Sequence, residues 1–103
     1  DWGVPTAASV HYCVDAGLTT IATGGIRHGM DVARAVALGA SCAGIARNVY
    51  QAFLEGGAEG ARDFLLRVER ELRSIMLLCG AKTIEDLQQA PRIVTGELRD
   101  WIA

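Results

Sequence analysis

The sequence predicts an α/β fold in which short parallel strands alternate with helices. The 103 residues are 50% hydrophobic and 21% charged, a composition typical of a globular domain. Stretches with apolar residues at three- and four-residue spacing alternate with short stretches of β-branched or small residues. Glycine-rich turns follow both strand-like stretches. This order of helix, strand, helix, strand and helix is typical of βα repeats.

The first helix and strand are predicted near the start of the chain. Residues 6–16 carry apolar side chains on one helical face, and Gly17 follows where a left-handed C-cap is expected. Residues 18–23, with the sequence LTTIAT, are short and β-branched. We expect them to form a parallel strand that is buried on both faces.

A second helix and strand repeat this pattern. The helix is predicted from about Met30 to Leu38, with Val32, Ala35 and Val36 on its inward, apolar face. Residues 41–46, with the sequence SCAGIA, form the second predicted strand. Two buried strands cannot close a sheet, so we expect the missing strands to come from elsewhere.

The second half of the chain is predicted to be helical. A short helix over residues 49–54 ends at the break Gly56-Gly57, and a long helix follows over residues 58–79. The apolar stripe of the long helix consists of Ala61, Phe64, Leu65, Val68, Leu72, Ile75, Met76 and Cys79. Thr83 and Asp86 resemble a capping box for a helix over residues 84–88, and a last turn is predicted through Trp101.

Composition excludes several classes of function. The net charge of −2 gives no basic field, so we expect no nucleic-acid partner. No apolar run is long enough to span a membrane, and we expect a cytoplasmic protein. The three cysteines, Cys13, Cys42 and Cys79, form no C-x-x-C pair. They predict neither disulfides nor a metal site, and we expect all three to be buried.

Two turns carry the chemistry that the sequence predicts. Residues 23–27 (TGGIR) follow the first strand, and Ala46-Arg47-Asn48 follow the second, each turn leading into a helix. Such turns present free backbone N–H groups and the positive end of a helix, which suits a phosphate. Gly25 and Ala46 are 21 residues apart, about one βα unit, so the turns should lie side by side. Phosphate sites of this kind follow strands seven and eight of (β/α)8 barrels.

Single side chains near these turns leave alternatives open. Arg27 and Arg47 contact the phosphate or lie in solvent, since main-chain contacts suffice. We expect His28 to be a solvated loop residue. Glycines at a turn also occur for tight geometry alone, without any ligand.

One segment of the chain resembles a group of flavin enzymes, and three separated motifs resemble one family within that group. Residues 22–40 resemble the FMN-phosphate segment of flavin-dependent (β/α)8 barrel enzymes. Met30 stands where those enzymes often have a small hydroxyl residue that caps the helix, so the resemblance implies a weakened cap here. The start Trp2-Gly3-Val4-Pro5-Thr6-Ala7, residues 80–87 (GAKTIEDL) and residues 95–101 (TGELRDW) resemble type 2 isopentenyl-diphosphate isomerases. The resemblance covers essentially the whole chain.

This resemblance implies a site and a reaction. The FMN phosphate would be bound by Gly24, Gly25, Ile26, Arg27, Ala46 and Arg47, and Trp2 and Gly3 would lie near the flavin rim. Residues 1–103 would form the C-terminal segment of an FMN-dependent (β/α)8 TIM barrel domain, with strands seven and eight. The start without methionine agrees with a fragment.

The family's activity would belong to the complete protein. That enzyme would interconvert isopentenyl and dimethylallyl diphosphates with FMN, Mg²⁺ and NADPH as the flavin reductant, as a homo-oligomer. The Mg²⁺ ligands and catalytic residues would lie outside this segment, so we expect the isolated segment to be inactive.

Two other functions stay open. In FMN-dependent α-hydroxy-acid oxidases and dehydrogenases, an H-G-G-R-Q motif lies about one βα unit before such a segment, whereas residues 1–9 here read DWGVPTAAS. The third interpretation is a non-catalytic phosphate-binding module that works as a partial barrel and pairs its strands across subunits.

Overall fold

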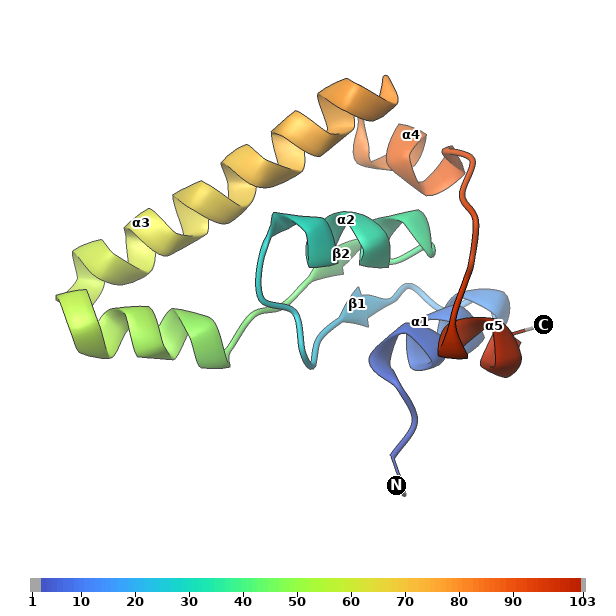
Figure 1. Ribbon diagram of the computed structural model, residues 1–103, viewed down its shortest axis with the longest axis horizontal. Helices are drawn as coiled ribbons and strands as arrows, with labels where there is room; N and C mark the ends of the chain where they lie inside the picture. Colours follow the sequence, from blue (N-terminus) through green and yellow to red (C-terminus); the bar gives the residue numbers. More distant parts are fainter. Residues whose placement is uncertain (1–2, 103) are drawn as a thin grey trace.

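The structure, a computed structural model, describes residues 3–102, and its helices alternate with two short strands (Figure 1). The elements in chain order are α1 (Thr6–Asp15), β1 (Ile21–Ala22), α2 (Gly29–Ala37), β2 (Cys42–Ala43), α3 (Arg47–Cys79), α4 (Ile84–Gln89) and α5 (Glu97–Ile102). The predicted alternation of helices and strands is confirmed. The strands are shorter than predicted, and α2 begins one residue earlier.

The two strands are parallel, but they are covered on one face only. Ile21 pairs with Cys42 and Ala22 with Ala43 in the parallel register. Ala22 is buried at 1% exposure, whereas Ile21 is 65% exposed and Cys42 beside it is also exposed. The prediction that the first strand is buried on both faces is therefore wrong. The helices of the described residues cover only the alanine face of this two-stranded sheet.

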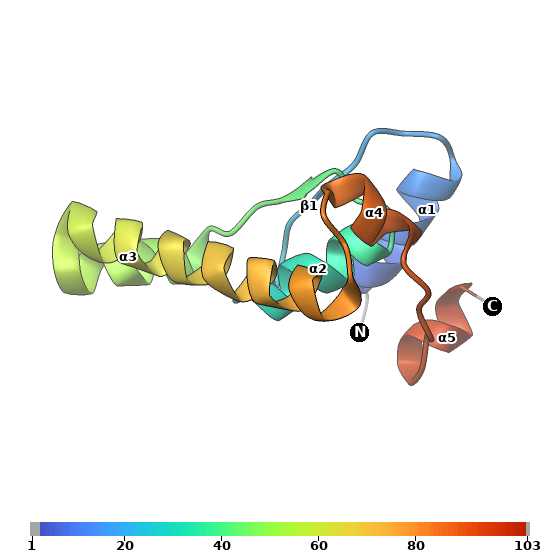
Figure 2. The ribbon, with the colours of Figure 1, turned by 90° about the horizontal axis from the view of Figure 1, so that it is seen from above.

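Helix α2 lies at the centre of the packing, and Figures 1 and 2 show it between α3, α4 and α1. Val36 is 1% exposed and belongs to a core cluster with Val68 of α3 and Leu87 of α4. A second cluster joins Ala35 of α2 to Val10 of α1. In the two clusters, Val36 and Ala35 belong to the apolar face that the sequence predicts for this helix. This packing fixes where the N-terminus of α2 lies.

Helix α3 is sharply bent, and the part after the bend runs back toward the core (Figure 1). The bend is at Gly57, whose backbone has φ 67° and ψ −156°, and separates a first leg (residues 47–56) from a second leg (residues 58–79). Near the bend, a side chain at Gly60 would place its Cβ 2.5 Å from the Ala52 carbonyl oxygen. The predicted break at Gly56-Gly57 is confirmed.

We expect Gly57→Ala to destabilise the protein. The φ and ψ of Gly57 lie in a region that is essentially restricted to glycine, and such strain costs about 1–3 kcal/mol. Urea unfolding of the variant should therefore give a lower midpoint. Gly56→Ala is the control, because a Cβ at Gly56 meets nothing within 4 Å. Equal midpoints for the two variants would contradict the backbone requirement.

The apolar stripe of the second leg is confirmed in part. Val68 is buried, and Phe64, Leu72, Ile75 and Met76 pack against the core cluster. Leu65 is 49% exposed and Cys79 is exposed, because they lie beside this contact rather than in it. The expectation of three buried cysteines is also wrong. Cys13 is half-buried, whereas Cys42 lies on the open face of the sheet.

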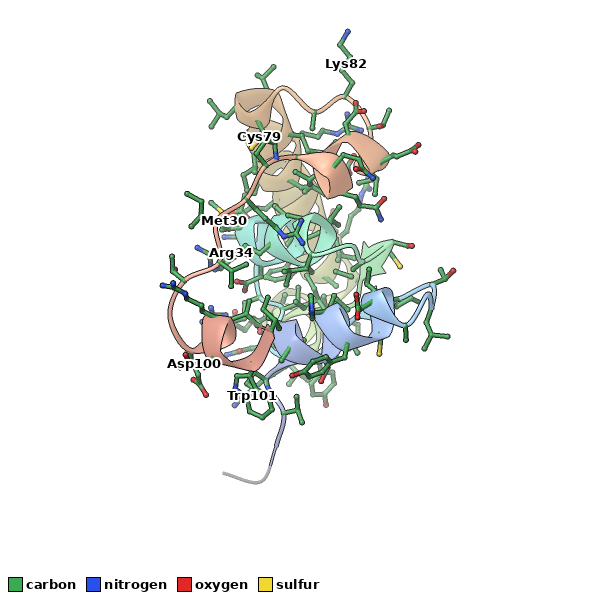
Figure 3. All side chains as sticks on the ribbon, turned by 90° about the vertical axis from the view of Figure 1, so that its right-hand side faces the viewer. Met30, Arg34, Cys79, Lys82, Asp100 and Trp101 are labelled. Atoms are coloured by element: carbon green, nitrogen blue, oxygen red, sulfur yellow. The ribbon has the colours of Figure 1, made fainter. Side chains whose placement is uncertain are left out.

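The C-terminal helices are held by specific hydrogen bonds. The Thr83 hydroxyl accepts from the Asp86 N–H at 3.0 Å, and the Asp86 carboxylate accepts from the Thr83 N–H at 3.1 Å. The predicted capping box of α4 is therefore confirmed. The Tyr12 hydroxyl of α1 donates to the Trp101 carbonyl, and Figure 3 shows Trp101 beside α1.

Among the described residues, no helix has the length and apolar character that crossing a membrane requires.

A candidate phosphate site at two strand ends

The turns that follow β1 and β2 meet around one pocket. Its volume is about 280 Å³, and it is lined by Thr23, Gly24, Gly25, Ile26, Arg27, Gly44, Ala46, Arg47 and Asn48. The parallel pairing of the strands causes this meeting, because the Gly44 N–H donates to the Ala22 carbonyl at 2.7 Å. All six residues proposed from the sequence to bind phosphate line this pocket. Thr23 and Asn48, which belong to the two motifs, also line it, and Gly44 is a further lining residue just before the second motif.

The glycine loop (residues 23–27) has a backbone that requires its two glycines. Gly24 has φ 98° and Gly25 has φ 73°, conformations that residues with a side chain rarely adopt. A Cβ at Gly24 would also lie 3.1 Å from the Thr6 hydroxyl oxygen of α1, while a Cβ at Gly25 would point into open space. The glycines therefore serve the turn, and they leave its main chain uncovered on the pocket side.

The first turn of α3 offers open donors to the pocket. Ala46 is the N-cap residue, and neither its side chain nor any acidic residue in the first turn occupies the helix end. The first N–H groups of a helix have no partner within it, and together they carry a partial positive charge. Arg47 and Asn48 of this turn line the pocket. This helix end fits a phosphate.

The first turn of α2 differs, because side chains of the protein already occupy its donors. The Asp31 carboxylate accepts from the Arg27 N–H at 3.1 Å, and the Glu71 carboxylate of α3 accepts from the Gly29 N–H at 3.2 Å. The His28 Nδ1 accepts from the Asp31 N–H at 3.4 Å. The expectation that both turns present free N–H groups is therefore wrong for the Gly29 and Asp31 N–H groups of α2 and for the Arg27 N–H of the glycine loop. No side chain caps the first turn of α3.

His28 and Arg27 have roles that sequence reasoning missed. His28 lies in the loop before α2 with a 45% exposed side chain, as expected, but it is also the N-cap residue of α2. This cap corrects the weak cap expected at Met30. Figure 3 shows Met30 on the same side of α2 as Arg34. The Arg27 Nε lies 3.2 Å from the Asp31 carboxylate, and the Arg27 side chain is 63% exposed. The spacing of four residues between Arg27 and Asp31 was a local signal for this pair.

Asp31 is the centre of these interactions. Burial raises its pKa, but the hydrogen bonds from the Arg27 backbone and side chain, with the charges of His28 and Arg27, outweigh burial and lower the pKa below 3.8. The carboxylate is therefore ionised at neutral pH. It fixes the end of the glycine loop against α2.

We expect Asp31→Ala to destabilise the protein by about 1 kcal/mol at neutral pH, because it removes the acceptor of the hydrogen bonds from the Arg27 backbone and side chain. Because the folded-state pKa is lowered, this contribution is full above pH 3.8 and is lost as pH falls through the folded-state pKa. The difference between wild type and variant should therefore shrink in acid, as measured by urea unfolding across pH. Asp15→Ala, at an exposed position, is the control. A difference that is independent of pH would contradict this role.

Other parts of the surface are less suited to an anion. A larger groove of about 630 Å³ lies between α3 and α4, and the Glu69 and Arg73 side chains that border it pair with each other at 3.0 Å.

Within residues 3–102, no three His, Cys, Asp or Glu side chains gather as metal ligands do. We assign no metal site to these residues. Trp2, expected near the flavin rim, lies outside the described residues.

Comparisons with known proteins show which family the chain resembles. Residues 4–94 match the family of FMN-dependent dehydrogenases. The isopentenyl-diphosphate delta-isomerase of Methanopyrus kandleri is 46% identical over 99% of this chain and 29% of that protein. The enzymes of the same name from Methanothermobacter thermautotrophicus and Thermococcus kodakarensis are 42% and 40% identical, again over 99% of this chain. The chain thus spans less than a third of the length of these relatives.

Solved structures show the same local architecture. A lactate oxidase of Pediococcus acidilactici superposes with a TM-score of 0.73 and 32% identity over 82% of this chain and 24% of that chain. A mandelate oxidase superposes with a TM-score of 0.74 and 32% identity over 84% of this chain and 27% of that chain. These matches imply a TIM-barrel fold, and the resemblance to the isomerases is confirmed by the relatives above. The chain belongs to the FMN-dependent dehydrogenase family.

Proposed function

We propose that the pocket binds the phosphate of FMN in an isopentenyl-diphosphate isomerase. Gly24, Gly25 and Ile26 would bind it from the glycine loop, and Ala46 and Arg47 from the first turn of α3. Arg27 would border the site, with its main-chain N–H held by Asp31. The observation that carries the proposal is the meeting of two strand-end turns at a pocket into which an unoccupied helix N-terminus opens.

The complete protein would use this site within a larger catalytic centre. Residues 1–103 would supply strands seven and eight of a (β/α)8 barrel, as its C-terminal portion. Bound reduced flavin would supply the proton transfer that interconverts isopentenyl and dimethylallyl diphosphates. Mg²⁺, held by residues outside this chain, would neutralise the diphosphate, and NADPH would reduce the flavin. We propose a cytoplasmic homo-oligomer.

The test is an activity assay on the complete protein that contains these residues. Purified with FMN, NADPH and Mg²⁺, it should convert isopentenyl diphosphate to dimethylallyl diphosphate, as followed by NMR of the product. Oxidation of lactate or mandelate without isomerisation would instead support an α-hydroxy-acid oxidase. The oxidase structures favour that second candidate, although their identity of 32% is below the 46% of the Methanopyrus isomerase.

A third outcome concerns the 103-residue chain by itself. A non-catalytic phosphate-binding module would bind FMN as a symmetric oligomer, with strands paired across subunits. Flavin absorbance that elutes with an oligomer of the isolated chain would support this candidate. A colourless, aggregating chain would rule it out, and turnover by the isolated chain would contradict the expectation that it is inactive.

A further inference from the structure

Glu71 connects two helices next to the candidate phosphate site. It lies in the second leg of α3, and its Oε1 accepts a hydrogen bond from the Gly29 N–H at 3.2 Å, across 42 residues of sequence. Gly29 is the first residue of α2 and is buried. The bond is partly buried, and a carboxylate acceptor at the positive end of a helix is favourable. Glu71 is thus a long-range cap of α2.

The contact depends on the close approach of α3 to α2. A Cβ at Gly29 would lie 2.3 Å from the Glu71 Cβ and 2.8 Å from the Leu72 backbone nitrogen. Only a residue without a side chain lets the helices come this near. The two helices therefore meet at the point where the glycine loop enters α2.

Asp31 holds the same short segment at a second point. Its carboxylate accepts from the Arg27 N–H, two residues before Gly29. The segment that leaves the glycine loop is therefore held between a carboxylate of its own helix and a carboxylate of α3. Neither Glu71 nor Asp31 lines the phosphate pocket itself.

We propose that Glu71 is a positioning residue for the cofactor phosphate, an inference that rests on the proposed function. By binding the Gly29 N–H, Glu71 holds the start of α2 and so fixes the Gly24 and Gly25 main chain at the pocket. The N–H groups of Gly24, Gly25 and Ile26 and those of the first turn of α3 are then the phosphate donors.

The test compares FMN with riboflavin, which has the same ring system and no phosphate. Dissociation constants for both are measured by flavin fluorescence in the complete protein, and their ratio gives the preference for the phosphate. Glu71→Ala should lower this preference about tenfold, or about 1.4 kcal/mol, because the glycine loop is then no longer held in place for the phosphate. Glu71→Gln should restore the preference, because its amide oxygen can still accept from Gly29. Glu59→Ala, at an exposed glutamate of the same helix, is the control.

The outcomes separate this inference from the proposed function. A wild-type protein that binds FMN no better than riboflavin would overturn the phosphate site itself. A wild-type preference for FMN that Glu71→Ala leaves unchanged would overturn only the role of Glu71. Equal weakening of FMN and riboflavin would also overturn it, since a purely structural defect does not distinguish the phosphate. If Glu71→Ala does not fold, Glu71→Asp, one methylene shorter, carries the same test.

Discussion

Gly29→Ala is expected to destabilise the protein more than Gly57→Ala does, although each substitution adds a single methyl group. The Cβ at Gly29 would lie 2.3 Å from the Glu71 Cβ, 2.8 Å from the Leu72 nitrogen and 2.9 Å from the Val68 carbonyl oxygen. Two of these atoms are backbone, so relief requires the two helices to move apart. Overpacking of this kind costs about 3 kcal/mol. Urea unfolding of the complete protein should show a loss of this size.

Gly56→Ala provides the matched control for Gly29→Ala. A Cβ at Gly56 meets no atom within 4 Å, and alanine has the higher helix propensity. We expect this variant to unfold at the wild-type midpoint or slightly above it. A small effect of Gly29→Ala, comparable to that of Gly56→Ala, would show that α2 and α3 do not pack this closely.

Ala46→Asp is expected to abolish FMN binding without unfolding the protein. The new carboxylate would lie at the N-terminus of α3, where it satisfies the helix donors and repels the phosphate dianion. At a separation of about 4 Å, each pair of like unit charges near a surface costs about 4 kcal/mol. The dissociation constant for FMN should therefore rise by more than about 100-fold, as measured by flavin fluorescence.

The Ala46→Asn variant distinguishes the effect of the new negative charge on FMN binding from the effect of the larger side chain. Asparagine is nearly isosteric with aspartate and neutral, so it should weaken FMN binding far less. Thermal unfolding of the protein without flavin should show Ala46→Asp to be at least as stable as wild type, because an acidic N-cap favours the helix. Unchanged FMN affinity in Ala46→Asp would mean that the phosphate lies elsewhere.

Features with a local cause were predictable from the sequence. Gly17 and Gly80 end helices with positive φ, and the capping box of Thr83 and Asp86 forms as its spacing predicts. The bend at Gly57 was also predictable, because two adjacent glycines interrupt the helical pattern. Each of these signals involves residues only a few positions apart, so it can be recognised in the sequence without knowledge of the fold.

Features that depend on distant partners were not predictable. The exposure of Ile21 depends on which elements cover the sheet, and its β-branched side chain is equally compatible with burial. The bond between Gly29 and Glu71 spans 42 residues and has no pattern in the sequence. The sequence therefore predicted which turns form the pocket, but not that the donors of α2 are already occupied.

The bend of α3 also identifies where this fold can accept additional chain. Figure 2 shows the bend at the far end of the molecule from both termini. Cβ atoms at Gly56 and Gly57 meet nothing within 4 Å, and neither residue lines the phosphate pocket. Exposed tips of this kind tolerate insertions best. The bend is therefore the position at which a fluorescent reporter can be inserted to follow cofactor binding with least disturbance to the pocket.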